Sequence, residues 1–147
     1  MYKSAARWAQ KSHLPQNKEP ALSEHAIAAL DKPQWCSVYI VGARACGPLK
    51  IGYTTNASQE RLRQLQMSSP IKLRLFKEFH VPSEQIAREL ERMAHHCLRH
   101  HRRHGEWFER NVTQASLGVV EAAAAAGIAL YTQADIEAFA RSKSLFK

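Results

Sequence analysis

The chain has 147 residues, of which 45% are hydrophobic, and this is enough for one ordinary domain with a buried core. The chain has three cysteines without a paired framework, which argues against a disulfide scaffold, and it lacks both an apolar run of about 20 residues for a membrane span and an apolar core for a secretory signal near the N-terminus. These features predict a soluble cytoplasmic protein. The 21 Lys and Arg against 13 Asp and Glu give a formal net charge of +8, which favours a polyanionic partner, either nucleic acid or an anionic membrane surface.

Residues 1–35 are predicted to hold a loose N-terminal arm and one short helix. Residues 1–18 are polar and lack a sustained period, so we expect an arm there. The stretch EPALSEHAIAALDKP then places Pro20 at a helix start and Pro33 just after its end. The apolar stripe that would pack this helix against the domain consists of Leu22, Ala26, Ala29 and Leu30.

Two short segments rich in β-branched and aromatic residues predict an antiparallel hairpin. CSVYIV at 36–41 and LKIGYT at 49–54 flank GARACGP, whose glycines and proline suit a hairpin loop. We therefore expect two paired strands, with Tyr39 on the first and Lys50 and Tyr53 on the second.

A helix and a third strand are predicted to follow the hairpin. SQERLRQLQM at 58–67 has a narrow apolar stripe with Arg61 near its edge, and Asn56 or Ser58 can cap it. IKLRLFKEFHV at 71–81 alternates and predicts a half-buried strand. The apolar residues are Leu62 and Leu65 in the helix and Ile71, Leu73 and Leu75 in the strand, where they alternate with Lys72 and Arg74.

The longest helical pattern is SEQIARELERMAHHCLRHHRRH at 83–104, with Ser83 as its N-cap. Its apolar residues recur at the helical spacing and are expected to face the core: Ile86, Leu90, Met93, Ala94, Cys97 and Leu98. At about 100° per residue, Glu91 falls at the margin of this stripe. The same flank of the helix is expected to carry cationic side chains, namely Arg88, His95, Arg99 and Arg102.

The histidines of this segment suggest a second interpretation. His96 and His100, and likewise His100 and His104, are four residues apart, as two zinc ligands on one helix would be. A zinc site needs three or four convergent ligands, however, and His96 and His100 lie off the face of Cys97. A basic, pH-sensitive helix end that contacts backbone phosphates is therefore favoured.

Residues 111–147 are predicted to form a helical extension that packs on the same domain. TQASLGVVEAAAAAG is expected to be a helix that ends at Gly127, and TQADIEAFARSK opens with a Thr132 and Asp135 capping pattern. These helices also offer a surface for a homodimer. The sequence has no internal repeat and no second domain boundary, so residues 36–110 form the central unit.

Five short motifs follow one another in residues 36–110. They are Val38-Tyr39-Ile40, Lys50-Ile51-Gly52-Tyr53-Thr54, Arg61-Leu62 with Leu65, Glu91 with His95, and Gly105-Glu106-Trp107-Phe108. One motif of this length occurs often by chance, whereas five in this order are much more specific. Together they resemble the GIY-YIG nuclease superfamily, in particular its branch common in phage-related proteins.

The resemblance implies an α+β fold in which a small three-stranded antiparallel sheet is flanked by helices. The predicted strands and helices lead to the same arrangement of α and β elements independently. The resemblance also implies a metal-dependent endonuclease that hydrolyses DNA phosphodiesters, with DNA and not a membrane as the partner. It suggests Tyr39 as the group that activates water or passes its proton on, and Arg61 as the phosphate clamp.

The second strand departs from the namesake motif of the superfamily. Lys50 stands where that motif has tyrosine, and Tyr53 follows the glycine. The phage-related branch also has lysine there, so Lys50 and Tyr53 are both candidates for the second catalytic group. Many members carry an asparagine after the carboxylate helix, and Asn111 is the only nearby candidate.

The chemistry of phosphodiester hydrolysis assigns further roles. It needs a water near a proton acceptor, cations over the developing charge, and relief of charge on the leaving oxygen. One Mg²⁺ or Mn²⁺ held by a carboxylate and by substrate phosphate meets the third need, and Glu91 is the predicted ligand. The residues predicted to contact the DNA backbone are Arg63, Arg88, His95, Arg99 and Arg102. Trp107 and Phe108 are expected in the core, with Glu106 as an additional candidate for the site.

Two other functions fit the same residues. One is a catalytically inert DNA-binding module that keeps the fold and relies on the charge of +8. The other is a phage or prophage accessory protein that binds a protein through its neutral C-terminal helices. The sequence does not choose a DNA sequence or structure as the target.

Overall fold

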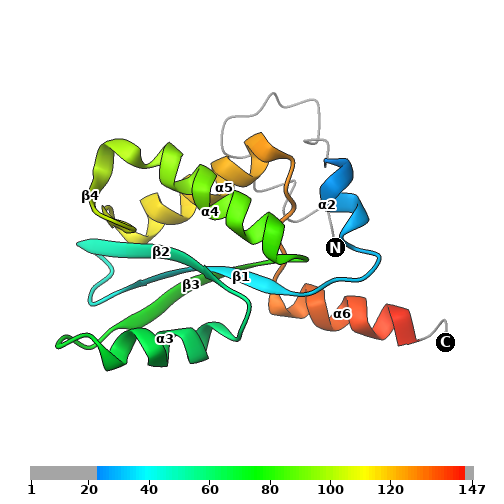
Figure 1. The fold of residues 1–147 in the computed structure, drawn as a ribbon, viewed down its shortest axis with the longest axis horizontal. Coiled ribbons are helices and arrows are strands. Elements are labelled where there is room, and N and C mark those ends of the chain that lie inside the picture. The colour runs from blue at the N-terminus through cyan, green and yellow to red at the C-terminus, as the bar shows by residue number, and fades with distance from the viewer. Residues whose placement is uncertain (1–22, 145–147) are drawn as a thin grey trace.

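A computed structural model describes residues 23–144, in which helices lie on both faces of an antiparallel sheet (Figure 1). The sheet has five strands in the order β3-β1-β2-β5-β4. The strands are β1 Cys36–Gly42, β2 Pro48–Thr54, β3 Arg74–Val81, β4 Arg102–His104 and β5 Trp107–Glu109. The helices are α2 Glu24–Ala28, α3 Ser58–Met67, α4 Glu84–Cys97, the 3₁₀ turn η1 Arg99–His101, α5 Val112–Ala126 and α6 Gln133–Ser144. The predicted α+β class is confirmed, whereas the predicted number of three strands is wrong.

The hairpin predicted from the two β-rich segments is confirmed. β1 pairs antiparallel with β2 on one side and with β3 on the other. Every residue of β1 is buried, as expected for the central strand of a sheet that is covered on both faces. The predicted arm at 1–18 and the predicted helix start at Pro20 with Leu22 lie outside the described residues.

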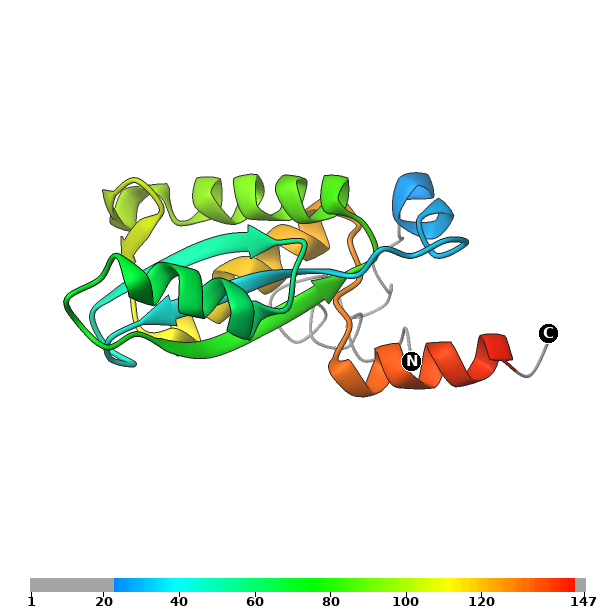
Figure 2. The ribbon, with the colours of Figure 1, turned by 60° about the horizontal axis from the view of Figure 1, so that its bottom comes forward.

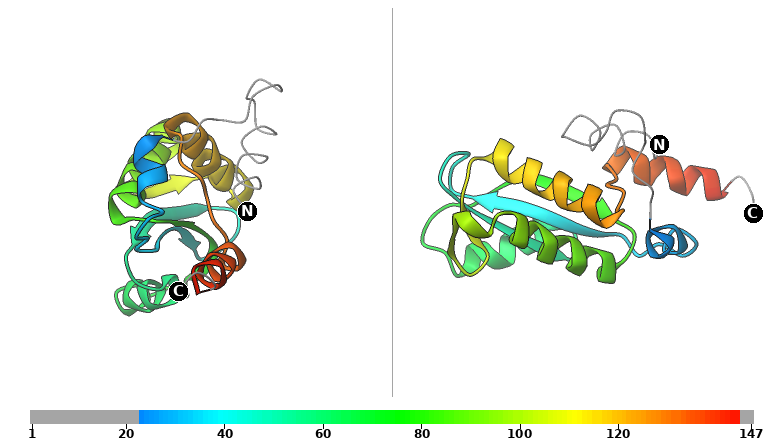
Figure 3. Two further views of the ribbon diagram at one scale, coloured as in Figure 1. Left: turned by 90° about the vertical axis from the view of Figure 1, so that its right-hand side faces the viewer. Right: turned by 90° about the horizontal axis from the view of Figure 1, so that it is seen from above.

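The main core lies between the sheet and the pair α4 and α5. Figures 1 and 2 show both helices on one face and α3 on the opposite face, and the view from above in Figure 3 shows α4 and α5 side by side. Val38 and Ile40 of β1 are fully buried against this helix pair, together with Leu90 of α4 and Val119 of α5. Because side chains alternate along a strand, Tyr39 points to the other face, towards α3.

The third strand begins later than predicted. β3 starts at Arg74, and Ile71 is 59% exposed in the loop before it. The pairing of β3 with β1 also shifts between Ile40 and Val41, so the alternation predicted over 71–81 is interrupted. An extra residue in one strand reverses the faces of the side chains that follow it, which explains why a strict period of two fails here.

The long helical pattern at 83–104 also ends early. α4 stops at Cys97, and the chain then forms η1 and the short strand β4. The predicted placement of Arg99 and Arg102 on the helix flank that carries Glu91 is therefore wrong. Cys97, which was predicted to face the core, is exposed. Gly105 turns the chain with φ +55°, which allows β5 to return against both β4 and β2.

The starts of α4 and α6 and the end of α5 are capped in the way that the sequence indicates. The hydroxyl of Ser83 accepts from the N–H of Ile86, Gly127 closes α5 with φ +68°, and the Thr132 and Asp135 side chains cap α6 reciprocally. The predicted caps of α3 are wrong. Its N-cap is Ala57, without a side-chain hydrogen bond, and Asn56 donates its backbone N–H to Thr54.

The last helix is held by the segment that precedes β1. The Trp35 ring contacts Phe139 of α6 edge-on at 6.0 Å and Tyr131 at 5.2 Å between ring centroids. The Lys143 ammonium donates to the carbonyl of Asp31 at 2.6 Å. Within residues 23–144, no helix has the length and hydrophobicity needed to cross a bilayer.

Candidate active site

A polar pocket of about 310 Å³ lies where β2 ends and α3 begins. Four residues predicted for the site line it, although they come from four different elements: Tyr39, Tyr53, Arg61 and Glu91. The other lining residues are Glu106, which the sequence predicts only as an additional candidate, and Thr54, Thr55, Asn56, Gln64 and Glu84. The fold therefore brings the tyrosines, the arginine and the helix carboxylate of the sequence motifs into one place.

Tyr39 and Arg61 are in contact across the gap between β1 and α3. The Nε of Arg61 donates to the hydroxyl of Tyr39 at 3.4 Å, and its Nη1 donates to the side chain of Gln64 at 3.0 Å. The Tyr39 ring is 2% exposed, whereas Arg61 is half-buried on the pocket wall. The tyrosine is thus fixed in the sheet, and the guanidinium keeps donors free to meet an anion in the pocket.

The glycine of the Lys50-Ile51-Gly52 motif makes room for that tyrosine ring. Gly52 is the cross-strand partner of Tyr39 in the β1–β2 ladder. A Cβ atom at position 52 would lie 2.4 Å from the Tyr39 hydroxyl and 2.7 Å from its Cζ. Only a residue without a side chain lets the ring lie flat across β2, so the glycine positions the tyrosine.

Glu91 has an unusual electrostatic environment. Burial and, after it, the nearby carboxylate of Glu106 raise the pKa of Glu91 to about 7. A hydrogen bond from the backbone of Tyr53 and the charge of Lys50 act in the opposite direction. A buried carboxylate whose ionisation is opposed by a neighbouring carboxylate forms a site where a cation is electrostatically favoured.

Lys50 acts on the pocket through Glu106. Its ammonium group forms a salt bridge with the Glu106 carboxylate, and its side chain is only 13% exposed. Lys50 is two residues from Gly52 and therefore shares the sheet face of Tyr39, whereas Tyr53 pairs with Val38 on the other face. Tyr53 lines the pocket directly and Lys50 does not.

Glu106 is a residue of the candidate site that the sequence places only as an additional candidate. Its only signal in the sequence is its place in Gly105-Glu106-Trp107-Phe108, which reads as a turn followed by core residues. The structure places its carboxylate among Lys50, Glu91 and His95, because its backbone carbonyl bonds to the N–H of Ile51 at the edge of β2.

Comparison with known proteins gives one match. The T5orf172 domain matches residues 37–124, which is more than half of the chain. The chain belongs to the T5orf172 domain family. No curated protein and no solved structure matches it. The matched region of this T5orf172 domain runs past the predicted central unit at 36–110 and includes most of α5, whose Ala115 and Val119 are fully buried in the same core.

His95 connects α4 of the T5orf172 domain to the sheet. Its Nε2 and the carbonyl oxygen of Ile51 are 2.8 Å apart, and its ring contacts Phe108 at 5.0 Å between centroids. Burial lowers the pKa of His95, so the ring is neutral at pH 7 and its Nε2–H donates to the carbonyl. Glu91 and His95, one helical turn apart, therefore both bond to the backbone of β2.

Replacing His95 with alanine should destabilise the fold by about 1–3 kcal/mol, because it leaves the Ile51 carbonyl without its partner and removes the ring packed on Phe108. Urea unfolding at pH 7.5 would measure this. His96→Ala is the matched control, since His96 is exposed on the same helix, and it should change stability by less than about 0.5 kcal/mol. Equal effects of the two substitutions would contradict the anchoring role.

The contribution of His95 to the free energy of unfolding should be present above pH 6.5 and fade as the pH falls below it, because the unfolded chain then binds the proton more readily than the folded chain.

The other basic residues predicted to contact DNA do not line the pocket. Arg63 is exposed and pairs with Glu60 at 2.9 Å. Arg88 is exposed on α4, the exposed Arg99 donates to the His96 carbonyl at 2.8 Å, and the Arg102 guanidinium lies 5.7 Å from the Phe108 ring centroid. Their contact with DNA stays a prediction.

The donor set of the pocket suits a hard divalent cation. Glu91 and Glu106 supply carboxylate oxygens, the ligands that Mg²⁺ and Mn²⁺ prefer. Burial and then the charge of Glu106 raise the pKa of Glu91, and a cation bound there would favour its ionised form. Two carboxylates would leave most coordination positions of the cation to water and to substrate phosphate, as is usual for Mg²⁺. The histidine tract, in contrast, is split between α4, η1 and β4, so the helical spacing behind the zinc interpretation is wrong. Among residues 23–144, no three His, Cys, Asp or Glu side chains converge on a metal position.

Proposed function

We propose that this T5orf172 domain is a metal-dependent DNA endonuclease of the GIY-YIG type, which nicks or cleaves DNA by phosphodiester hydrolysis. The observation that carries the proposal is the meeting of Tyr39, Arg61 and Glu91 in one polar pocket. The GIY-YIG resemblance gives Tyr39 and Arg61 the roles of proton transfer and phosphate binding, and the chemistry of phosphodiester hydrolysis gives Glu91 the role of metal ligand. The net charge of +8 agrees with a polyanionic substrate.

Each side chain has a task that its position allows. The Arg61 guanidinium has donors left for a phosphate oxygen beside the Tyr39 hydroxyl. The Tyr39 hydroxyl accepts from Arg61, which places a proton-transferring group beside the position proposed for that phosphate. Glu91 and Glu106 would hold one Mg²⁺ or Mn²⁺, which supplies electrostatic stabilisation of the charge that develops on the phosphate and leaving oxygens. Lys50 keeps the Glu106 carboxylate oriented through their salt bridge.

The test is nicking of supercoiled plasmid by the full chain in Mg²⁺ or Mn²⁺ and in EDTA. Tyr39→Phe keeps the buried ring and removes only the hydroxyl, so a proton-transfer role predicts a loss of about 100-fold or more without unfolding. Arg61→Ala should cause a comparable loss. Arg92→Ala, which removes an exposed arginine of α4 outside the pocket, should nick at the wild-type rate.

Two outcomes would overturn the proposal. Nicking that persists in EDTA, or that Tyr39→Phe and Arg61→Ala leave unchanged, would show that another activity is responsible. Binding of DNA by the wild-type chain without nicks in either metal would instead identify a DNA-binding module that keeps the fold without the chemistry.

A further inference from the structure

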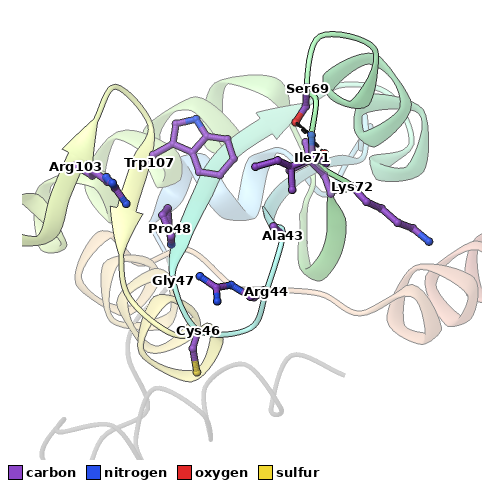
Figure 4. Close-up of a pocket in the computed structure, with 11 residues that line it drawn as sticks. Ala43, Arg44, Cys46, Gly47, Pro48, Ser69, Ile71, Lys72, Arg103 and Trp107 are labelled. Carbon is purple, nitrogen blue, oxygen red and sulfur yellow. Dashed lines mark hydrogen bonds between the residues drawn. The ribbon is translucent and has the colours of Figure 1, made fainter.

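A second and larger pocket, of about 710 Å³, lies at the opposite end of β2 (Figure 4). We call it the Trp107 pocket. It is formed by the β1–β2 loop, by the loop between α3 and β3, and by the short strands β4 and β5. The residues used below are Arg44, Pro48, Ile71, Lys72, Arg103 and Trp107. None of the residues that line it lines the candidate active site.

The walls of the Trp107 pocket are apolar and partly aromatic. Figure 4 shows the indole of Trp107 at one side of the hollow, above Pro48, with Ile71 across from it. Trp107 is half-buried and Ile71 is 59% exposed, although both are large apolar side chains. An accessible indole face with apolar neighbours is a surface on which a flat ring system can stack.

Three cationic side chains line the same pocket, and no acidic one does. Arg103 is neutralised in part by Glu109, at 2.5 Å. Neither Arg44 nor Lys72 forms a salt bridge with any residue of the described chain. In Figure 4 the guanidinium of Arg44 curls back towards Gly47, whereas the Lys72 side chain extends away from the indole. The pocket thus combines one stacking surface with positive charge at two different positions on its border.

The Trp107 pocket lies on the face of the sheet to which Tyr39 of the candidate active site points. Trp107 pairs with Lys50, which shares the face of Tyr39 and Gly52. α3 also connects them, because Arg61 and Gln64 line the first pocket and Ser69, just after the helix, lines the second. Pro48 and Tyr53, one from each pocket, are about 17 Å apart along β2 at a rise of about 3.4 Å per residue.

We propose that the Trp107 pocket binds an unpaired nucleotide of a DNA strand, with its base stacked on the Trp107 indole and its flanking phosphates beside Arg44 and Lys72. An acidic peptide would match the cations but would leave the indole and Ile71 unused. A stacked base needs both features, and a base held in a duplex cannot lay its face on an indole that forms the wall of a pocket. The inference goes beyond the proposed function, since it requires binding and not cleavage.

The experiment is fluorescence anisotropy of a ten-nucleotide oligothymidylate and of a blunt duplex of equal length, with the full chain in EDTA so that nothing is cut. Trp107→Ala and Arg44→Ala should each weaken single-strand binding by about tenfold, and Trp107→Phe should keep most of the affinity. The same two substitutions should weaken binding of the duplex by less than about threefold. Arg92→Ala, which removes the same charge from the outside of α4, should bind the single strand like the wild type.

A second measurement does not depend on the stability of any variant. Photocrosslinking of the wild-type chain to an oligonucleotide with 5-iodouracil should place the adduct on Trp107 by mass spectrometry. An adduct elsewhere, equal losses for duplex and single strand, or unchanged binding by Arg44→Ala would overturn the inference. Displacement by polyglutamate at the same charge concentration as the oligonucleotide would also overturn it, because the pocket would then recognise charge alone.

The two proposals fail separately. If plasmid nicking is absent while the single strand binds through Trp107 and Arg44, the nuclease is refuted and the Trp107 pocket stands. If nicking depends on Tyr39 and Arg61 while single-strand binding is unchanged by Trp107→Ala, the nuclease stands and the Trp107 pocket is refuted as a nucleotide site.

Discussion

Replacing Glu91 with glutamine is expected to abolish metal-dependent nicking and, at the same time, to make the folded protein more stable at pH 8. The activity should fall by about 100-fold or more, because on the proposed function the amide lacks the charge that would hold the cation. A residue that only supports the fold would lose stability and activity together. Opposite changes in the two properties are therefore the signature of a carboxylate kept at the site for function.

The sign of the stability change follows from the raised pKa of Glu91. Its folded-state pKa is about 7, against an ordinary value of 4.5. Between these values the folded chain holds a proton that the unfolded chain releases, so the contribution of Glu91 to stability falls as the pH rises and is least favourable above pH 7. Glu91→Gln removes this penalty and should stabilise the protein by about 1–3 kcal/mol at pH 8, with no gain near pH 4.

Urea unfolding in EDTA at pH 4, 6 and 8 measures this difference. Glu89→Gln is the matched control, because Glu89 lies two residues away on α4 and does not line the pocket. It should leave both the stability difference and the nicking rate unchanged. A Glu91→Gln variant that is destabilised at pH 8 would refute the electrostatic explanation.

The pH dependence of nicking should follow the same group. At low Mg²⁺ the rate should rise about tenfold per pH unit up to about pH 7 and then level off, because one carboxylate must be deprotonated. Metal and proton compete for Glu91, so a higher Mg²⁺ concentration should move the midpoint to lower pH. A midpoint that does not move would assign the titration to another group.

The elements that the sequence predicted well are those whose signals are local. The β1–β2 hairpin has apolar, β-branched strands around a glycine and proline loop, and α3 occupies the predicted residues 58–67. α4 begins at Ser83, whose capping of the Ile86 N–H is a local feature of the sequence. In each case the residues that determine the element are inside it or next to it.

The end of α4 could not be predicted in this way. Arginine and histidine do not mark a helix end, so residues 98–104 continue the helical pattern without a break. The chain leaves the helix because Phe108, fully buried, pairs with Leu49 at the edge of β2, and Leu98 packs against Gly118 of α5. These partners are far away in the sequence, and strands of three residues carry too little pattern of their own.

The residues of the candidate site were likewise predicted where their signals are local and missed where they depend on contacts distant in the sequence. Tyr39, Tyr53, Arg61 and Glu91 stand in short motifs that the fold brings to one pocket. Glu106 joins them only because the turn before β5 bonds to Ile51, a contact that depends on the unpredicted strand. The tight fit between Gly52 and Tyr39 is likewise a property of the strand register.

Among substitutions that add one methyl group to the site, Gly52→Ala should have the largest effect on stability and activity. Its Cβ would lie 2.4 Å from the Tyr39 hydroxyl, and the ring cannot move to solvent because it is 2% exposed. Overpacking of this kind costs about 1–3 kcal/mol. The displaced hydroxyl would no longer accept from Arg61, so nicking should fall as far as it does in Tyr39→Phe.

A double-mutant cycle separates this clash from the general effect of alanine in a strand. Tyr39→Leu removes the hydroxyl, Cζ and Cε1 atoms that the new methyl group would meet. In that background Gly52→Ala should be neutral or stabilising by up to about 1 kcal/mol, since alanine limits the unfolded chain more than glycine does. The coupling between the two positions, measured by urea unfolding, should therefore reach about 2–3 kcal/mol. Additive effects would mean that the glycine serves the strand and not the tyrosine, and this motif would have no link to the Tyr39 hydroxyl.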